Sequence, residues 1–425
     1  MLDHREIHYA RSTNRLPVMR IAVVAFAVLV AAHCGDDDAP AASTRWAATW
    51  TASPQNYNEV IPVPGVPQAQ PRALKDKTLR QIVHTSIGGT GLRIKLSNSF
   101  GTTPLTVSDI RVARSTGGAQ IDVSSERPVV FDQKTSVTVA AGAEAWSDAT
   151  SWDLPTNVDL AISFYLPNET PIATFHGTGL QTNYIGSGSA VSAAGLDGAE
   201  TVTSYYWLSG IDVMRPDTAK VIVAFGDSIT DGAASTVSAN ERWPNLLDRR
   251  LQSSPSAGPV SVVNAGISGN RWLNDVIGPS GSTRFDRDVI RVSGATHAIL
   301  VLGINDIGFS AFDPSQAVSA DAMTASIASA VTKAKAAGLK VYLATLLPFK
   351  GATYYSDEAE SKRQSVNAWI RATKTADGVI DFDAAMGEPS DPLTLRAVFD
   401  PGDHLHPNDA GYQAMADAID LQLLR

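Results

Sequence analysis

Cysteine is nearly absent from this sequence, and Cys34 is the only example in 425 residues. Beyond that position the chain therefore has no disulfide bond, no thiolate metal site and no cysteine nucleophile. Its eight histidines nowhere form the H-E-x-x-H pair of a zinc-binding helix. We therefore expect no metal site in this protein.

Positive charge is also in short supply, because 34 Lys and Arg residues face 43 Asp and Glu residues, for a net charge of −9. Proteins that bind nucleic acid need a basic face that displaces counterions from phosphates, so this balance argues against a nucleic acid partner. Hydrophobic residues at 44% and charged residues at 18% are typical of a globular protein. A chain of 425 residues is long enough for two domains.

Long hydrophobic runs are missing as well. The apolar run at Ile21–Ala32 has twelve residues, whereas a membrane-spanning helix needs about 20. The run fits the central part of a secretory signal, so we predict a signal peptide at residues 1–34 and an exported protein, in the periplasm, in the cell envelope or outside the cell. Met19-Arg20 precedes the run directly and makes a better signal start than Met1, which suggests Met19 as the true first residue.

The end of this leader allows two interpretations. The segment from Ala31 to Asp38 resembles a bacterial lipobox, in which Cys34 would carry a lipid anchor to the membrane. His33 departs from that motif, which has a small residue there. The alternative is an ordinary signal peptide cut near Ala39–Ala42. In either case residues 35–45, rich in Gly, Asp, Ala, Pro and Ser, are predicted to form a flexible tether.

Period-two hydrophobicity marks residues 46–214. Leu92–Leu96 alternates apolar and polar residues, and Leu160–Phe164 does so more loosely. Turn residues such as Gly88-Gly89 and Pro167-Asn168 separate these runs. The pattern predicts an all-β sandwich domain of short antiparallel strands.

The pattern changes near residue 215, and residues 219–425 are predicted to form a second domain. Val221–Phe225 is a continuous apolar run, as expected of a strand buried on both faces. Asp321–Ala337 carries its apolar residues on one helical face. Repeated strands and helices predict an α/β fold with a parallel sheet sandwiched by helices. Further strands are expected at 260–265, 298–302, 340–347 and 379–382, and further helices at 243–251, 361–374 and 409–424.

Two polar motifs follow the first two strands of this domain. Gly226-Asp227-Ser228 puts a serine hydroxyl directly after a buried strand, which suits a nucleophile but also an ordinary polar turn. The next strand is followed by Gly266 and Gly269, which can aim a backbone N–H at a developing oxyanion or can simply form a loop.

Two more motifs complete the set. Gly303-Ile304-Asn305-Asp306 follows the third strand, and its asparagine amide can donate to the same oxyanion or form an Asx turn. Asp403-His404-Leu405-His406 lies near the C-terminus, where an aspartate can orient a histidine base or the segment can be a solvated loop. Each motif alone has such an ordinary explanation, but all four fall at one edge of the predicted sheet.

In order, spacing and content the four motifs resemble the SGNH/GDSL hydrolase family, over residues 219–425, about half of the chain. The resemblance implies a flavodoxin-like SGNH fold, a carboxylic ester hydrolase and no cofactor. It implies Ser228 as the nucleophile, His406 as the general base and Asp403 as the residue that orients it. It also implies an oxyanion hole formed by the N–H groups of Ser228 and Gly269 and by the amide of Asn305.

Some neighbours compete for these roles. Gly266 is the alternative to Gly269, which we prefer because it ends the run where the family's motif ends. His404 is the alternative to His406, which the D-x-x-H spacing favours. Asp227 and Asp306 are expected to brace their loops rather than to react.

The first domain resembles the β-rich domain that precedes the catalytic domain in some secreted bacterial members of this family, through Trp46–Trp50, Thr78–Gln81 and Leu96–Gly101. Its aromatic residues can bind carbohydrate or wall the substrate, or they can form its core. We favour the core, since aromatic residues in strands usually pack. The residues concerned are Trp46, Trp50, Tyr205, Tyr206 and Trp207.

The substrate is predicted from context. Export, a β-rich domain and an acidic surface suggest an acylated carbohydrate or another small extracellular ester, with acetyl esters of a polysaccharide as the first choice. Trp272 and Leu273 either wall a small acyl pocket or pack in the core. A lipase or lysophospholipase is the second candidate, and a binding protein on an inactive scaffold is the third. The intact Ser228, Asn305 and His406 argue against that third candidate. The sequence makes no prediction of oligomeric state.

Overall fold

The computed structural model describes residues 43–61, 68–216, 218–254 and 258–425, and the chain from residue 42 onward forms one compact unit. The predictions for residues 1–34, including Met19 and Cys34, lie outside the described residues. Among the described residues, no helix is both long and apolar enough to cross a membrane.

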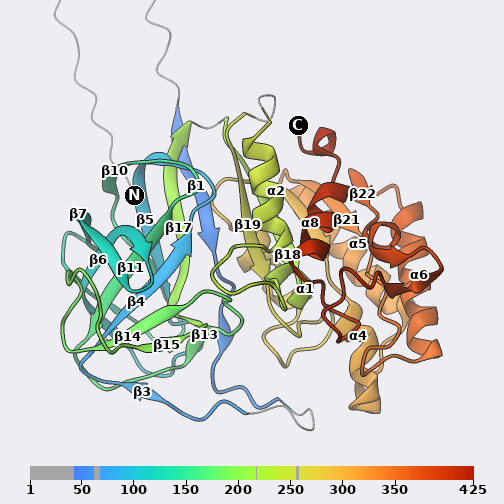
Figure 1. Cartoon of the computed structure of the whole chain (residues 1–425), viewed down its shortest axis with the longest axis horizontal. Helices are drawn as coiled ribbons and strands as arrows, with labels where there is room; N and C mark the ends of the chain where they lie inside the picture. The colour runs from blue at the N-terminus through green and yellow to red at the C-terminus, as the bar shows by residue number, and fades with distance from the viewer. Residues whose placement is uncertain (1–42, 62–67, 217, 255–257) are drawn as a thin grey trace, which may run out of the picture. The chain divides into compact units, whose positions relative to one another are not determined.

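Residues 44–216 form the β-domain, in which two antiparallel sheets share one hydrophobic core (Figure 1). The first sheet has the order β1 (Thr44–Thr51), β17 (Leu208–Pro216), β5 (Gly89–Ser97) and β10 (Thr150–Leu154), with β9 (Glu144–Trp146) beside β5. The second has the order β15 (Glu200–Val202), β14 (Asn183–Ser187), β4 (Lys77–His84), β11 (Asp159–Leu166), β6 (Leu105–Gly117) and β7 (Gln120–Val129), with β8 (Ser136–Val139) beside β6. Alternate residues of β5, namely Leu92, Ile94 and Leu96, are fully buried. The predicted β-sandwich is confirmed.

Shorter strands pair beside these sheets. They are β2 (Gln55–Asn56), β13 (Thr174–His176) and β16 (Tyr205–Tyr206) in one group, and β3 (Ala73–Leu74) and β12 (Thr170–Pro171) in another.

The limits of the β-domain differ slightly from the predicted 46–214. β1 begins at Thr44 and β17 ends at Pro216. These two residues pair with each other, although almost the whole domain lies between them in sequence. A partner so distant in sequence leaves no local pattern. Thr44 and Arg45 therefore belong to a strand rather than to the predicted tether, of which residues 35–42 lie outside the described part.

Residues 220–425 form the α/β domain, which is built on a five-stranded parallel sheet. Its strand order is β19 (Val260–Gly266), β18 (Lys220–Gly226), β20 (Ala295–Val301), β21 (Lys340–Ala344) and β22 (Gly378–Ile380). Numbered from the first strand of this domain, the order is 2-1-3-4-5, the flavodoxin-like arrangement. The predicted fold class is therefore confirmed. A short hairpin, β23 (Gly387–Glu388) and β24 (Asp391–Leu395), follows the sheet.

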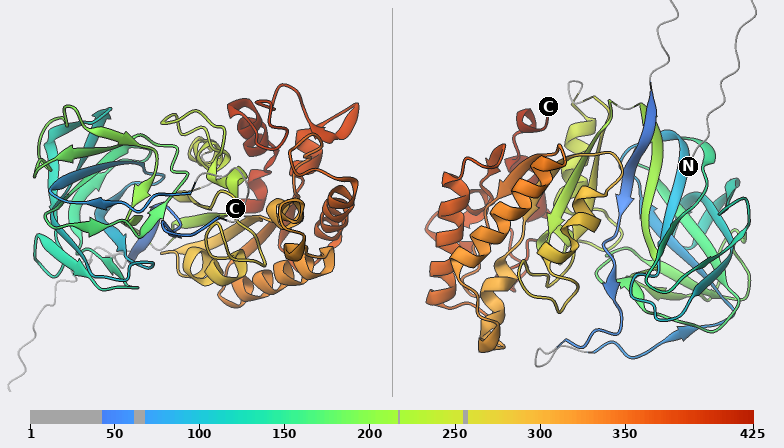
Figure 2. Two further views of the ribbon diagram at one scale, coloured as in Figure 1. Left: turned by 90° about the horizontal axis from the view of Figure 1, so that it is seen from below. Right: turned by 180° about the vertical axis from the view of Figure 1, so that it is seen from behind.

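Helices cover both faces of this sheet. The α-helices are α1 (Ser228–Asp231), α2 (Trp243–Gln252), α3 (Gly281–Phe285), α4 (Ile304–Gly308), α5 (Ala320–Ala336), α6 (Asp357–Ala372), α7 (Phe382–Met386) and α8 (Asp409–Ala418). The remaining turns are the π-helix η1 (Asp286–Ile290) and the 3₁₀ helices η2 (Phe309–Ala311), η3 (Pro314–Gln316) and η4 (Leu421–Leu424). α2 packs on α8 in front of the sheet in Figure 1, whereas α5, which packs on α6, lies in front in the view from behind (Figure 2, right).

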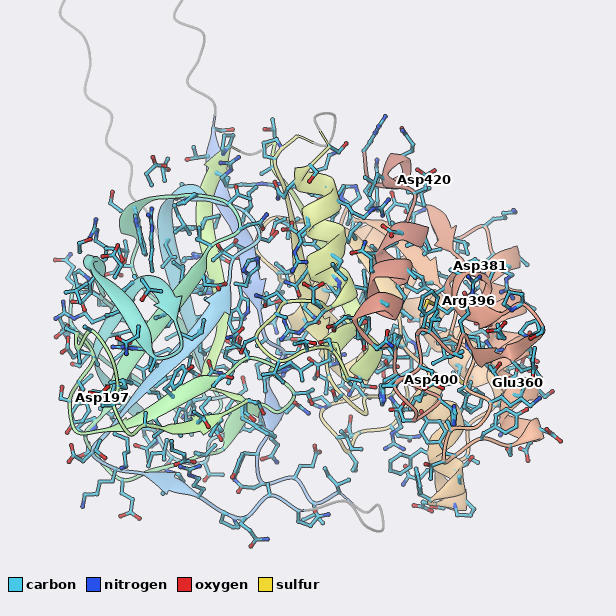
Figure 3. The ribbon with its side chains drawn as sticks, viewed as in Figure 1. Asp197, Glu360, Asp381, Arg396, Asp400 and Asp420 are labelled. Carbon is cyan, nitrogen blue, oxygen red and sulfur yellow. The ribbon has the colours of Figure 1, made fainter. Side chains whose placement is uncertain are left out.

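Two predicted elements end at least three residues earlier in the structure than expected. The last helix was expected over 409–424, but α8 ends at Ala418 because Asp420 (Figure 3) accepts the N–H of Gln422 and starts the separate turn η4. The fourth strand was expected over 340–347, but β21 ends at Ala344. Beyond it the N–H of Leu346 donates to the Asn367 side chain on α6 instead of continuing the ladder.

β1 links the two domains through its backbone and small side chains. Ser261 of β19 donates its hydroxyl hydrogen bond to the Ala48 carbonyl at 2.7 Å, and Thr51 donates to the Asn264 carbonyl at 2.6 Å. Ala47 and Ala48 are buried in the core of the α/β domain rather than in that of the β-domain. The β-domain is thus packed directly against an edge strand of the parallel sheet.

Candidate active site

The parallel sheet brings the four sequence motifs to one edge. β18 lies between β19 and β20. The chain therefore runs from β18 to β19 on one side of it and then crosses to β20 on the other side. Sites in doubly wound folds lie at this switch point, beyond the carboxyl ends of the strands. Ser228 follows β18, the loop at residues 267–270 follows β19, and Asn305 follows β20.

The turn at Ser228 depends on a glycine that no other residue can replace without displacing a neighbour. A Cβ atom on Gly226 would lie 2.2 Å from Thr230 Oγ1 and 2.5 Å from the Val301 carbonyl oxygen. Asp227 then caps the short helix α1 by accepting the N–H of Ile229 at 3.0 Å. The serine is thereby fixed as the first residue of that helix.

Ser228 lies within hydrogen-bonding distance of His406, which in turn contacts Asp403. The Oγ of Ser228 is 2.8 Å from His406 Nε2, and His406 Nδ1 is 2.6 Å from Asp403 Oδ2. Because a carboxylate only accepts, Nδ1 carries the ring proton and Nε2 has the lone pair that faces the hydroxyl. The structure therefore brings together the three side chains that the resemblance implied.

Asp403 is held in its ionised form. Burial opposes ionisation, but hydrogen bonds from the His406 ring and from the backbone N–H groups of His406 and Leu405 outweigh it and lower the pKa of Asp403 to about 2. Its other oxygen accepts those two N–H groups at 2.9 and 3.0 Å. The same carboxylate thus orients the imidazole and shapes the loop that carries it.

The rival histidine has a different partner. His404 Nδ1 lies 2.6 Å from Asp400 (Figure 3), and its side chain is 51% exposed. Its backbone is left-handed, with φ of 59°, and its N–H also donates to Asp400. One loop therefore contains two His–Asp pairs, and Ser228 contacts the His406 pair.

The two candidate glycines are also distinguished. The Gly266 N–H already donates to Asn264 Oδ1 at 2.8 Å. Gly269 has φ of 80°, and within the described residues neither its N–H nor that of Ser228 donates a hydrogen bond. A Cβ on Gly269 would lie 2.7 Å from the Ile277 side chain. These observations favour Gly269 over Gly266 as a donor to a bound oxyanion.

Asn305 lies in the first turn of α4 and contacts the same 267–270 loop. Its Nδ2 donates to the Asn270 carbonyl at 3.1 Å, which leaves a second amide hydrogen, and its Oδ1 accepts the Tyr354 hydroxyl at 3.4 Å. These two contacts fix which end of the amide faces the 267–270 loop.

Asp306 and Asp227 are buried beside the candidate site and brace it. Asp306 accepts the N–H groups of Trp272 at 2.7 Å and Leu273 at 3.1 Å, which ties the loops after β19 and β20 together. Burial raises the pKa of Asp306 to about 6 and that of Asp227 to about 7. Their hydrogen bonds agree with the expected bracing role.

Arg284 supports the candidate site but matches none of the sequence motifs. This side chain is fully buried in α3, and its two terminal nitrogens donate to the Gly226 carbonyl at 2.7 Å and the Ala265 carbonyl at 2.8 Å. Its Nε donates to Asn270 at 2.9 Å. Arg284 therefore holds the carboxyl ends of β18 and β19 together through hydrogen bonds to their backbone carbonyls. An arginine in a short helix has no local signature for this role.

The aromatic residues mostly pack. Trp272 is 1% exposed, donates to the Leu302 carbonyl and lies against Phe225, so it is part of the core rather than a pocket wall. In the β-domain, Tyr205, Tyr206 and Trp207 are buried, Trp50 stacks edge-on against Tyr205, and Trp46 lies under Arg93. Leu273 is partly buried. Among the described residues no group of three or more His, Cys, Asp or Glu side chains is arranged to hold a metal ion.

A 2-1-3-4-5 sheet with a serine hydroxyl beside a His–Asp pair at its switch point is the architecture of a hydrolytic enzyme. Residues 224–414 match the GDSL-like Lipase/Acylhydrolase family and form a domain of that family. The chain is accordingly a carboxylic ester hydrolase.

Two solved structures illustrate what the chain is similar to. A GDSL-like lipase from Bacteroides thetaiotaomicron is 23% identical, with 49% of this chain and 88% of that chain covered and a TM-score of 0.36. The acetylxylan esterase Axe2 from Geobacillus stearothermophilus is also 23% identical, with 48% and 93% covered and a TM-score of 0.38. Comparison with curated proteins finds no match.

Proposed function

We propose that this protein hydrolyses carboxylic esters through an acyl-enzyme formed on Ser228. The observation that carries the proposal is the continuous chain of hydrogen bonds from the Ser228 hydroxyl through His406 to Asp403, with distances of 2.8 and 2.6 Å. A serine hydroxyl is a weak nucleophile unless a base removes its proton, and this geometry supplies the base and its orienting carboxylate.

The reaction proceeds in two halves. Ser228 Oγ attacks the ester carbonyl while its proton moves to His406 Nε2, and the carbonyl oxygen becomes an oxyanion. The carbon–oxygen bond to the alcohol then breaks, and His406 gives that proton to the departing alcohol. Water enters, loses a proton to His406 and attacks the acyl group. Ser228 leaves as its hydroxyl is reprotonated, which releases the acid.

The N–H groups of Ser228 and Gly269 and the Asn305 amide are the proposed donors to the oxyanion. The free N–H groups and the position of the Asn305 amide support this role. Removal of one such donor typically costs about 100- to 1,000-fold in turnover.

Hydrolysis of p-nitrophenyl esters from acetate to palmitate tests the proposal. The purified wild type should be active, Ser228→Ala inactive, and Asn305→Ala reduced about 100-fold or more in kcat. Asn168→Ala, in an exposed turn, is the matched control and should retain full activity. A Ser228→Ala variant with wild-type turnover would overturn the nucleophile assignment.

We further infer that the substrate is a short acyl ester, with acetyl groups of a polysaccharide as the first choice. An enzyme that acts on aggregated lipid needs an exposed apolar patch. Among the described residues, the exposed large hydrophobic side chains are four valines on separate segments, Val60, Val123, Val237 and Val398. Ile277, packed beside Gly269, also narrows the space next to the proposed oxyanion site.

We take a hollow of about 210 Å³ in the β-domain as a candidate carbohydrate subsite. Its lining combines amide and hydroxyl side chains, including Asn56, Asn58 and Thr170, with apolar ones such as Phe100 and Leu105. Acetate release from acetylated xylan, compared with acetate release from p-nitrophenyl acetate, tests the choice. Cleavage restricted to palmitate or other long-chain esters would instead favour the lipase or lysophospholipase candidate.

Export stays part of the proposal and is supported by the apolar run at Ile21–Ala32 alone. Cell fractionation of the wild type and a Cys34→Ala variant distinguishes the destinations. Loss of membrane association in Cys34→Ala indicates a lipid anchor. A soluble exported wild type indicates an ordinary signal peptide, and retention of the wild type in the cytoplasm would contradict export.

A further inference from the structure

A histidine of the β-domain, His176, is buried against Asp231 of the α/β domain. Asp231 lies three residues after the proposed nucleophile, Ser228. His176, at the end of β13, is 6% exposed. Its Nε2 lies 2.9 Å from Asp231 Oδ1 at the end of α1, and its Nδ1 lies 3.0 Å from the Ser53 carbonyl oxygen. His176 therefore connects the two domains through a buried pair of titratable side chains.

The partners of His176 and Asp231 constrain the hydrogen bond between them. The Ser53 carbonyl only accepts, so Nδ1 carries a proton, and Asp231 accepts two hydrogen bonds on its other oxygen. When the ring is doubly protonated, Nε2 donates to Asp231 Oδ1 and the two residues form an ion pair. Burial opposes the charge on His176, but Asp231 outweighs it and raises the pKa of His176.

The two donors to Asp231 Oδ2 both belong to Ser268. The Ser268 N–H and hydroxyl each donate at 2.9 Å, and the next residue is Gly269. The direction of the Gly269 N–H follows from the peptide plane that joins it to Ser268. The contact between His176 and Asp231 therefore helps to hold Ser268 in place. The peptide bond after Ser268 in turn sets the direction of the proposed oxyanion donor, the Gly269 N–H.

The β-domain holds the same loop region from a second side. Glu59 accepts the Gly278 N–H at 2.7 Å, and the preceding Ile277 side chain packs where a Gly269 Cβ would lie. Val276 and Ile277 have φ of 78° and 65°, which is strained for β-branched residues and persists only when the surroundings hold it.

We propose that His176 is a positioning residue for ester hydrolysis, through which the β-domain holds Asp231, Ser268 and hence the oxyanion-binding N–H of Gly269. The β-domain then helps to position groups of the active site and is not a separate module. This inference rests on the proposed function, because it concerns the oxyanion site of the same reaction.

The test compares three variants with the wild type on a short p-nitrophenyl ester. His176→Leu removes the donor to Asp231, and a misplaced site group can cost up to about 100-fold, so kcat should fall at least about tenfold with KM little changed. His176→Gln keeps an N–H donor near the position of Nε2 and should recover most of that loss.

Ser86→Ala is the matched control. The Ser86 hydroxyl donates to the buried Asp248 of α2 at 2.6 Å and accepts the Val262 N–H of β19 at 2.9 Å, so it too is a buried contact between the domains. Among the described residues, no hydrogen bond joins Asp248 to the 267–270 loop. Ser86→Ala should lower Tm and leave kcat unchanged. The inference is overturned if His176→Leu keeps wild-type kcat while its Tm falls, or if Ser86→Ala loses as much kcat as His176→Leu.

Two further readouts separate the possible failures. If His176→Leu does not fold, Ser268→Ala takes its place, since it removes only the hydroxyl contact to Asp231, and a wild-type kcat in that variant would overturn the inference. If the wild type does not hydrolyse esters or Ser228→Ala stays active, the proposed function fails. An active wild type and inactive Ser228→Ala, with unchanged kcat in His176→Leu, defeats the positioning role alone.

Discussion

The ring Nε2 of His406 lies 2.8 Å from the hydroxyl of Ser228, although 178 residues separate them in sequence. Two residues earlier in the same loop, His404 Nδ1 lies 2.6 Å from its own aspartate, Asp400, which is the same distance as that between His406 Nδ1 and Asp403. The chain therefore contains an internal comparison between a His–Asp pair that contacts the serine and a neighbouring pair with a different environment.

Substitution of the two aspartates separates these pairs. Asp403→Asn should lower kcat on the order of 1,000- to 10,000-fold, because an amide in place of the carboxylate favours the wrong tautomer of His406. Asp400→Asn should leave kcat within about twofold of wild type, since an amide oxygen still accepts the Gly402 and His404 N–H groups and Ser228 contacts the other His–Asp pair. Steady-state kinetics on a short ester check both, and equal losses in the two variants would contradict the assignment.

Gly269 tests the oxyanion loop. A Cβ there would meet Ile277 at 2.7 Å, and φ is 80°. Gly269→Ala should therefore shift the loop and lower kcat at least about tenfold. Gly338→Ala is the control, because Gly338 has φ of 85° but open space around its Cβ position. Both alanines should cost about 1 kcal/mol of stability through backbone strain. We expect a kcat loss for Gly269→Ala alone, and a matching loss in Gly338→Ala would contradict the role of Gly269 in the oxyanion loop.

Arg284 tests the support beneath the site. Arg284→Lys keeps the charge near Asp288 but cannot donate to both the Gly226 and Ala265 carbonyls. Arg363→Lys is the matched control, since Arg363 is equally buried and donates to Glu360 and Asp383. Each variant should lose on the order of 1–3 kcal/mol in the free energy of unfolding. We expect kcat to fall about tenfold or more in Arg284→Lys only, and an unaffected kcat there would contradict the supporting role.

The raised pKa of Asp227 predicts that the free energy of unfolding depends on pH. Its pKa is about 7 in the folded protein against an ordinary value of 3.8, so the folded state holds a proton that the unfolded chain releases. The stability from this group is complete below about pH 4 and is lost as pH rises through about 7. Asp227→Asn keeps an acceptor for Ile229 and has no carboxyl to ionise. Its Tm should exceed that of the wild type at pH 8 and match it near pH 4, and parallel Tm curves across this range would contradict the buried state of Asp227.

The features predicted from sequence are those with a local pattern. The buried strand Val221–Phe225 and the one-sided helix at Asp321–Ala337 correspond to β18 and α5 because periodicity reports burial directly. The motif at Ser228 could be anticipated because a parallel sheet gathers the residues that follow its strands.

The features that sequence reasoning missed depend on contacts between distant segments. Arg284 reaches Gly226 across 58 residues, and His176 reaches Asp231 across 55 residues and between two domains. Asp231 lies three residues after Ser228, which was the one available signal, but nothing local indicates a histidine partner. A buried polar side chain satisfied by remote groups has no periodic signature.

Covalent labelling with a fluorophosphonate ester, followed by mass spectrometry of the proteolysed protein, shows whether His406 activates Ser228. Such a reagent is attacked by an activated serine and forms a stable phosphonylated adduct. We expect one adduct, on Ser228, that is absent in Ser228→Ala and much slower to form in His406→Ala. An adduct on another residue, or equal labelling of Ser228 in His406→Ala, would contradict the claim that His406 activates Ser228.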